Sequence, residues 1–146
     1  MTTRISFADQ YYYNGAADDH RPFVVVRLFP AGGPPLTVNA LLDTGAEWSV
    51  FSKALAPDLG IPDVTQNALR SIPLQTADNS PERFGFVHEV ELEWLGYRLP
   101  VPIAFVREWP DDIDNLIGMR GLFEELIVAV HHRQRTVYVT RSIAAL

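Results

Sequence analysis

The segment 84–94 alternates between apolar and charged side chains with a period of two residues. Its members divide between two faces of a strand: Phe84, Phe86, His88, Val90, Leu92 and Trp94 on the first, and Glu89, Glu91 and Glu93 on the second. Such a period is typical of an antiparallel strand that is buried on one side only. The chain is therefore expected to fold around an antiparallel sheet with the first face turned inward.

Short β runs account for most of the remaining chain. Segments 23–29 and 36–43 are rich in apolar and β-branched residues, and the segment 30–35 between them consists mainly of proline and glycine. This pattern predicts a hairpin. Segments 126–130 and 136–139 are predicted to form two further strands, joined by a polar turn.

The long strand is expected to turn at Leu95-Gly96-Tyr97 into a partner strand. Four residues of the partner would line its inward face: Leu99, Val101, Ile103 and Phe105. Pro100 and Pro102 lack the backbone N–H that a ladder needs, which indicates that the partner is in part an edge strand.

Helical signals are few. Segment 52–59 begins with the capping residue Ser52 and precedes Gly60, which predicts one short helix. Segment 119–126 is predicted to form another. The predicted fold class is therefore mainly β, with one or two short helices.

Composition limits the classes of protein that remain. The chain has 146 residues, 47% of them hydrophobic and 21% charged, which suits a single folded domain over 1–146 with an N-terminal arm at 1–20 and a core at about 21–140. A net charge of −6 disfavours nucleic acid as a partner. The lack of cysteine excludes thiolate metal sites and Cys nucleophiles. No apolar run nears the roughly 20 residues of a membrane span, so we expect a cytoplasmic protein without membrane contact.

The segment Leu41-Leu42-Asp43-Thr44-Gly45-Ala46 is the least typical of ordinary packing. An ionised Asp at the end of a buried strand is costly unless it is paired or hydrogen-bonded. Thr44 can close a tight turn with its hydroxyl group, and Gly45 permits close approach of another backbone. Two interpretations follow from the residues alone: a plain β-turn with an Asx hydrogen bond, or a carboxylate held for chemistry.

This segment resembles the active-site loop of the retropepsin-like aspartic proteases, the single-lobed relatives of pepsin. Leu116-Ile117-Gly118 resembles the second signature of that family, which packs against the loop and precedes a short helix. The resemblance covers about 21–139, and the strands after Gly118 look closer to bacterial than to viral members. It implies a closed or partly open β-barrel with a flap, which is a β-hairpin that closes over the substrate.

The resemblance also implies roles for individual residues. Asp43 would be catalytic, and Thr44, Gly45 and Ala46 would complete its loop. The flap would correspond to segment 72–94. Substrate would contact the residues after the loop and those at the flap tip: Glu47, Trp48, Val50, Ala77, Asp78, Asn79 and Ser80. Trp48 and Val50 are expected to line apolar subsites.

Two positions depart from the retroviral pattern. Many retroviral members have an Asp after the loop and an Arg after the second-signature Gly, and these form an ion pair near the dimer interface. Here Glu47 follows Ala46, and Met119 and then Arg120 follow Gly118. The resemblance therefore implies that this ion pair is replaced and the interface altered.

The number of motifs implies an assembly. Pepsin-like chemistry needs two carboxyl groups that share one proton, and this sequence has one Asp-Thr-Gly. The resemblance thus implies a homodimer in which Asp43 of a second copy completes the site. The expected activity is that of an aspartic endopeptidase on peptide or protein substrates, with no cofactor and no metal. The alternative is a dimeric peptide-binding or scaffold module with the same fold but no turnover.

Other conspicuous residues have simpler interpretations. His131 and His132 are neighbours in sequence, so in a strand they would point to opposite faces and could not hold one metal ion together. His88 is expected to be a core or interface histidine. Tyr11-Tyr12-Tyr13 is expected to belong to an ordered N-terminal arm that packs on a partner.

Overall fold

The computed structural model describes residues 2, 4–15, 20–76, 78 and 80–141. Ten strands lie within this part of the chain: β1 (Asp9–Tyr12), β2 (Phe23–Phe29), β3 (Leu36–Leu42), β4 (Ser49–Val50), β5 (Arg70–Leu74), β6 (Arg83–Trp94), β7 (Tyr97–Val106), β8 (Leu116–Ile117), β9 (Leu126–His131) and β10 (Thr136–Arg141). The helices described are short: η1 (Lys53–Leu55), η2 (Pro57–Leu59), α1 (Leu122–Glu125) and η3 (His132–Gln134). The mainly β fold class predicted from the sequence is confirmed.

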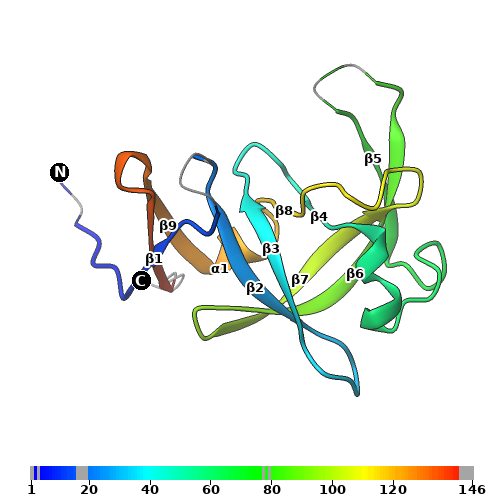
Figure 1. Cartoon of the computed structure of the whole chain (residues 1–146), viewed down its shortest axis with the longest axis horizontal. Helices are drawn as coiled ribbons and strands as arrows, with labels where there is room; N and C mark the ends of the chain where they lie inside the picture. Colours follow the sequence, from blue (N-terminus) through cyan, green and yellow to red (C-terminus); the bar gives the residue numbers. More distant parts are fainter. Residues whose placement is uncertain (1, 3, 16–19, 77, 79, 142–146) are drawn as a thin grey trace.

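Six of the strands close into a barrel in the order β2-β3-β8-β4-β7-β6, because β2 also pairs with β6. The closing pairs are Arg27↔Glu93, Leu28↔Leu92 and Phe29↔Glu91. Figure 1 shows β2 and β3 crossing β6 and β7, with β5 and the adjoining end of β6 projecting at one end of the molecule and β1 and β9 at the other. The barrel encloses the main apolar core, whose fully buried members include Val24, Val26, Leu28, Leu92, Val101, Ile103 and Phe105.

The predicted alternation holds for only part of β6. Val90, Leu92 and Trp94 are buried inside the barrel as expected. Phe84, however, is 52% exposed, so its predicted inward position is wrong. Phe86 is only half-buried. The buried apolar side chain in this half of β6 is Val87, on the other face.

The physical reason lies in what β6 packs against at each end. Near Trp94 the strand belongs to the barrel, whereas near Arg83 it leaves the barrel and pairs with β5. There the opposite face is covered by a second apolar cluster, whose buried members are Val50, Ile72, Val87, Ala104 and Val106. Period two assigns residues to alternate faces, but it does not say which face is covered.

A separate three-stranded sheet has the order β1-β10-β9 and joins the two ends of the chain. Tyr11 on β1 packs edge-on against Trp94, with ring centroids 6.1 Å apart, and its hydroxyl oxygen accepts the N–H of Val25 at 3.2 Å. Tyr13 is buried in the main core, and Tyr12 is 68% exposed. Tyr11 and Tyr13 therefore pack on their own chain, which differs from the expected packing on a partner.

The helix expected over 52–59 is divided into η1 and η2. Ser52 caps η1 through a hydrogen bond from Ala54 N–H to its hydroxyl oxygen. Pro57 interrupts the helix because it has no N–H to continue the pattern, and it begins η2 instead. No helix in the described residues has the length and apolarity that a membrane crossing needs.

Candidate active site

Asp43 is the first residue after β3, at the point where β3 runs parallel to β8. The paired residues are Leu41↔Leu116 and Leu42↔Ile117. Asp43 N–H then donates to the Ile117 carbonyl oxygen at 2.9 Å. The active-site loop and the second signature expected from the sequence therefore lie side by side.

The loop after Asp43 is an Asx turn. Oδ1 of Asp43 accepts the N–H of Gly45 at 2.9 Å, and the Asp43 carbonyl oxygen accepts the N–H of Ala46 at 3.2 Å. The Asp43 side chain is half-buried, whereas Thr44 and Gly45 are exposed. One carboxyl oxygen is thus oriented by the backbone of its own loop, while the group remains accessible from outside.

The second signature holds the far side of this loop through its backbone. Three N–H groups donate across the contact: Gly118 to Ser49 Oγ at 3.1 Å, Met119 to the Ala46 carbonyl at 2.8 Å, and Arg120 to the Glu47 carbonyl at 2.9 Å. Ser49 is fully buried, and its hydroxyl has this N–H as a partner. The sequence analysis did not single out Ser49, and the only signal would have been a hydroxyl beside apolar Val50.

Glu47 and Arg120 form an ion pair across the same contact. Oε1 of Glu47 accepts from Nε of Arg120 at 3.0 Å and from Nη2 at 2.8 Å. Although the Arg lies one position later than in the retroviral pattern, the acidic residue after the loop still pairs with an Arg after the second-signature Gly. The turn after Gly118 directs Arg120, not Met119, toward Glu47, so within the subunit a Glu–Arg pair takes the place of the Asp–Arg pair of the retroviral pattern.

The hairpin of β5 and β6 corresponds to the expected flap. Oδ1 of Asp78 accepts a hydrogen bond from the Thr76 hydroxyl and another from Ser80 N–H at 3.0 Å. These hydrogen bonds lower the pKa of Asp78 to about 2, and the bond from the Thr76 hydroxyl has the largest effect. Ala77 and Asn79, also expected at the tip, lie outside the described residues.

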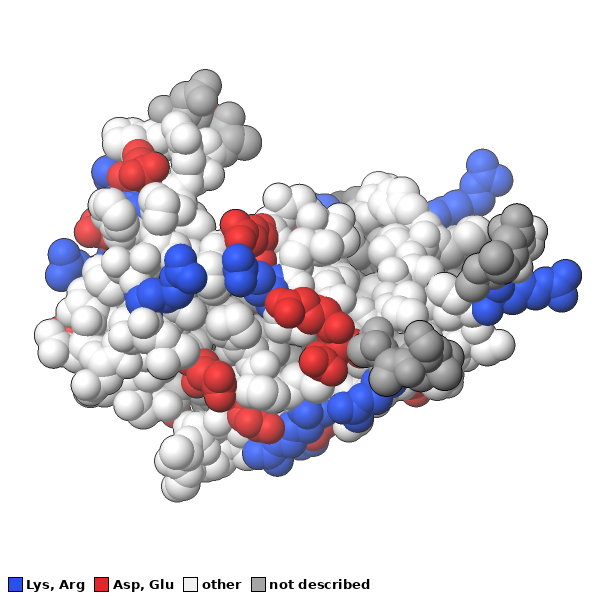
Figure 2. Space-filling view, turned by 180° about the vertical axis from the view of Figure 1, so that it is seen from behind, with Lys and Arg blue, Asp and Glu red and all other residues white. Residues whose placement is uncertain are grey.

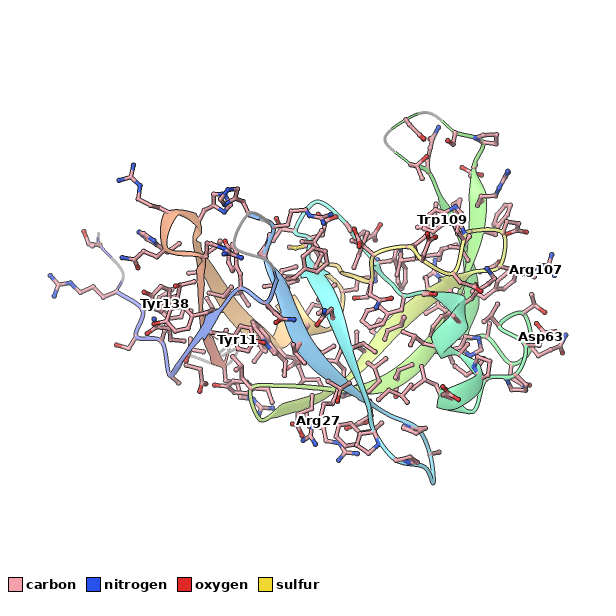
Figure 3. All side chains as sticks on the ribbon, in the orientation of Figure 1. Tyr11, Arg27, Asp63, Arg107, Trp109 and Tyr138 are labelled. Carbon is pink, nitrogen blue, oxygen red and sulfur yellow. The ribbon has the colours of Figure 1, made fainter. Side chains whose placement is uncertain are left out.

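A cavity of about 600 Å³ lies between this hairpin, Val50 of β4 and the segment 108–116, which ends at the first residue of the second signature. Its apolar lining consists of Val50, Pro81, Trp109, Pro110, Ile113 and Leu116. Its polar lining consists of Thr76, Ser80, Arg83, Glu108 and Asp114. Figure 3 shows Trp109 on the loop after β7, beside the β5–β6 hairpin. The sequence analysis did not identify Trp109, since a single tryptophan in a polar loop carries no pattern.

Trp48 and Val50 were expected to line apolar subsites together. Val50 lines the cavity just described. Trp48 instead lines a separate groove of about 610 Å³, together with Arg70 and Arg120. Strand alternation would place residues 48 and 50 on one side, but Trp48 precedes β4 (Ser49–Val50) and does not follow that period.

The other expected residues lie apart from this site. His88 is buried, donates from Nε2 to the Val64 carbonyl oxygen at 2.7 Å, and packs on Phe105, so it is a core residue. Nδ1 of His131 accepts the N–H of Gln134 at 3.3 Å. Within the described ranges, no three His, Cys, Asp or Glu side chains are grouped so that they could hold a metal ion.

Comparisons with known proteins agree with this geometry. A family model described as aspartyl protease matches residues 30–120, which include the Asp43 loop, the β5–β6 hairpin and the second signature. The chain therefore belongs to the aspartyl protease family, and the retropepsin-like resemblance of its two signatures is confirmed.

Among solved structures, the chain is similar to one described as EIAV protease complexed with the inhibitor HBY-793. The two are 21% identical with a TM-score of 0.44, over 72% of this chain and 88% of that chain. A comparison with curated proteins finds no match.

Proposed function

We propose that this protein is an aspartic endopeptidase that works as a homodimer, with one Asp43 from each subunit. The observation that carries the proposal is the position of Asp43. Its half-buried carboxyl group stands at the open end of β3, with Oδ1 held by Gly45 N–H in a loop that the second signature supports. A carboxyl group so oriented can hold a water molecule.

A dimer is required because one chain supplies one such loop. In the proposed site the two carboxyl groups lie about 3 Å apart and share one proton, since two anions at that distance repel strongly. The symmetry of the pair requires a two-fold axis that passes between the two Asp43 loops. The exposure of Thr44 and Gly45 supports this arrangement, because these residues are open to contact with a second subunit.

The reaction would proceed by general acid–base catalysis. The ionised Asp43 takes a proton from the bound water while the water oxygen attacks the scissile carbonyl carbon. The protonated Asp43 of the other subunit donates its proton to the carbonyl oxygen. The resulting tetrahedral diol collapses when the proton now held by the first carboxyl passes to the amide nitrogen and the C–N bond breaks. A proton returns from the diol to the second carboxyl, which restores the starting state.

The cavity beside the hairpin supports an apolar preference near the cleaved bond. Val50, Leu116 and Trp109 give it an apolar wall, and burial of an apolar side chain there would stabilise the complex by about 25 cal/mol per Å² of buried surface. The β5–β6 hairpin would add strand-like backbone hydrogen bonds to an extended peptide. We include the flap-tip residues Ala77, Asp78, Asn79 and Ser80 in the proposed substrate contacts.

The decisive experiment compares the parent with Asp43→Asn in cleavage of an unfolded protein substrate between acid and neutral pH. Asn retains an oxygen that can accept from Gly45 N–H, so the loop should keep its shape. We expect cleavage to fall by at least about 10³-fold, because a general acid–base group contributes about 10²–10⁴-fold and both copies are removed. Asp58→Asn, at an exposed position on η2, is the matched control and should cleave like the parent.

Two further measurements separate this proposal from a non-catalytic peptide-binding module. Sedimentation should give about twice the chain mass, and a strict monomer at high concentration would contradict the proposal. Pepstatin, a transition-state mimic, should inhibit cleavage, whereas EDTA should not. If the parent bound pepstatin but released no peptide products at any pH tested, the binding module would be the better description.

A further inference from the structure

Trp48 lies between the Asp43 loop and β4, five residues after the candidate catalytic carboxyl group. Its side chain is half-buried and packs against the second apolar cluster, which also contains Ile72 of β5 and Val87 of β6. The Trp48 ring also lies against the Arg70 side chain, at the base of the β5–β6 hairpin. The active-site loop and the hairpin meet at this indole.

Two guanidinium groups lie over the Trp48 ring. Cζ of Arg120 is 4.5 Å from the ring centroid, and Cζ of Arg70 is 5.2 Å from it. Both distances fall within the roughly 6 Å over which a cation is attracted to the face of an aromatic ring. The planar guanidinium also stacks on an aromatic ring more closely than an ammonium group can.

The two arginines come from different parts of the fold. Arg120 follows the second signature and is fixed by the Oε1 atom of Glu47 and by its own N–H bond to the Glu47 carbonyl. Arg70 is the first residue of β5 and pairs with Val87 of β6. The indole thus lies against one cation anchored to the active-site loop and another anchored to the hairpin.

β5 is the last strand in its sheet and pairs with β6 alone among the described strands.

Figure 2 shows acidic and basic side chains interspersed over the face of the molecule opposite to that of Figure 1, without one broad region of a single sign.

We propose that Arg70, Trp48 and Arg120 form a brace that couples the position of the β5–β6 hairpin to the Asp43 loop. Trp48 and Arg70 are positioning residues in this arrangement, because they act through the loop and the hairpin and not on the reacting atoms. The physical coupling stands on the contacts alone, whereas its consequence for catalysis rests on the proposed protease function. A shift of the hairpin base would move Arg70 over the indole and change the packing of Trp48.

The first test measures hydrogen exchange of the backbone in the full chain. Arg70→Gln removes one of the two cations over Trp48, leaves Arg120 in place, and does not alter the backbone of β5. We expect amides of β5 and of residues 83–87 to exchange about two- to five-fold faster, which corresponds to the strength of an exposed cation–π contact. Exchange in β9 and β10 should not change, which would show that the variant is folded.

Arg141→Gln is the matched control, because Arg141 lines the same groove, is exposed, and belongs to β10. It removes an equal charge without a guanidinium over Trp48 and should leave hairpin exchange as in the parent. If Arg70→Gln did not change hairpin exchange, there would be no coupling and the brace would be rejected. If Arg141→Gln changed hairpin exchange as much as Arg70→Gln does, the effect would be one of general charge, and the brace would again be rejected.

The second test follows the indole N–H resonance of Trp48 by NMR, assigned with Trp48→Phe. Arg70→Gln should shift this resonance, and Arg70→Lys should restore only part of the parent position because an ammonium does not stack as a guanidinium does. An identical Trp48 resonance in the parent and Arg70→Gln would overturn the proposal.

Kinetics then link the brace to the proposed activity. On a cleaved peptide, Arg70→Gln should raise KM about two- to five-fold with little change in kcat, as expected when the hairpin, which would bind ground state and transition state alike, is held less firmly. If exchange and NMR support the brace but the parent cleaves nothing, only the proposed protease function fails. If the parent cleaves peptides and KM does not change in Arg70→Gln, the catalytic consequence of the brace is wrong.

Discussion

Gly118 lies so close to the backbone of Trp48 that a Cβ atom at position 118 would come within 2.4 Å of the Trp48 carbonyl oxygen. The same atom would lie 2.8 Å from the carbonyl oxygen of Ala46. Both neighbours are backbone atoms, which cannot rotate away as a flexible side chain could. Because Ala46 and Trp48 flank the end of the Asp43 loop, this contact determines how closely the second signature can support it.

Gly118→Ala should therefore destabilise the protein. The added methyl group forces the two backbone segments apart, and overpacking of this kind costs about 1–3 kcal/mol. Denaturant unfolding would measure the loss of free energy. Gly33→Ala is the control, since the nearest atom to its Cβ would be a side-chain atom of Pro30 at 3.2 Å in an exposed turn. Equal stability of Gly118→Ala and Gly33→Ala would contradict the described contact.

The Glu47–Arg120 ion pair should contribute little to overall stability. Its side chains are 63% and 47% exposed, so water and salt screen the attraction. A double-mutant cycle of Glu47→Gln and Arg120→Gln is expected to give a coupling free energy of about 0.2–1 kcal/mol that decreases as salt is added. A coupling well above this range, or one insensitive to salt, would show that the pair is more enclosed than it is here.

Thr76→Val should raise the pKa of Asp78 from its value of about 2 toward that of an ordinary Asp. The Thr76 hydroxyl donates to Oδ1 and favours the charged form, and Val cannot donate. Since the pKa is lowered on folding, this carboxylate adds stability above its unfolded pKa of about 4, and the contribution is lost as pH falls toward about 2. Carbon-detected NMR titration of Asp78 would measure the change. Thr37→Val, on β3, should leave the Asp78 pKa as in the parent.

Tyr97→Phe should loosen β1. The Tyr97 hydroxyl donates to Oδ2 of Asp9 at 2.8 Å, which links β1 to the turn between β6 and β7. This bond, more than burial, raises the pKa of Tyr97. The group is largely solvated, so we expect the bond to stabilise folding by under about 1 kcal/mol.

The pH dependence of this bond has a definite sign. A raised folded pKa gives stability that is present below the unfolded value of 10.0 and is lost as pH rises through the folded one. The parent and Tyr97→Phe should therefore differ in stability at neutral pH and converge in alkali, as measured by unfolding at several pH values. Tyr138→Phe, whose ring packs on Phe7, is the control. A difference for Tyr97→Phe that persisted above the raised pKa would show that ring packing, not the bond to Asp9, is responsible.

Several elements of the fold were predictable because they depend on local patterns. The 23–29 and 36–43 hairpin, the partner strand with Leu99 and Val101 inward, and the two C-terminal strands all form as expected. The confirmed family follows from two short motifs around Asp43 and Gly118. In each case the spacing of apolar residues, or the order of a few residue types, carries enough information.

Other features depended on which parts of the chain meet in space. The alternation in β6 could not reveal that Phe84 is exposed, because the strand leaves the barrel and its other face is covered by Val50 and Ile72. Likewise, adjacency in sequence placed Trp48 with Val50, whereas the tertiary structure placed it against Arg70 and Arg120.

Local residue patterns were enough to predict the longer strands β2, β3, β6, β7, β9 and β10, the carboxyl group at the end of β3 and the glycine of the second signature. Each of these follows from residues within a few positions of one another. The ion pair of Glu47 with Arg120 and the contact of Trp48 with Arg70 join residues that are 73 and 22 positions apart, and they could be read only from the folded chain. Such contacts depend on how the strands twist and cross as the barrel closes, and the order of residue types along the chain does not specify this.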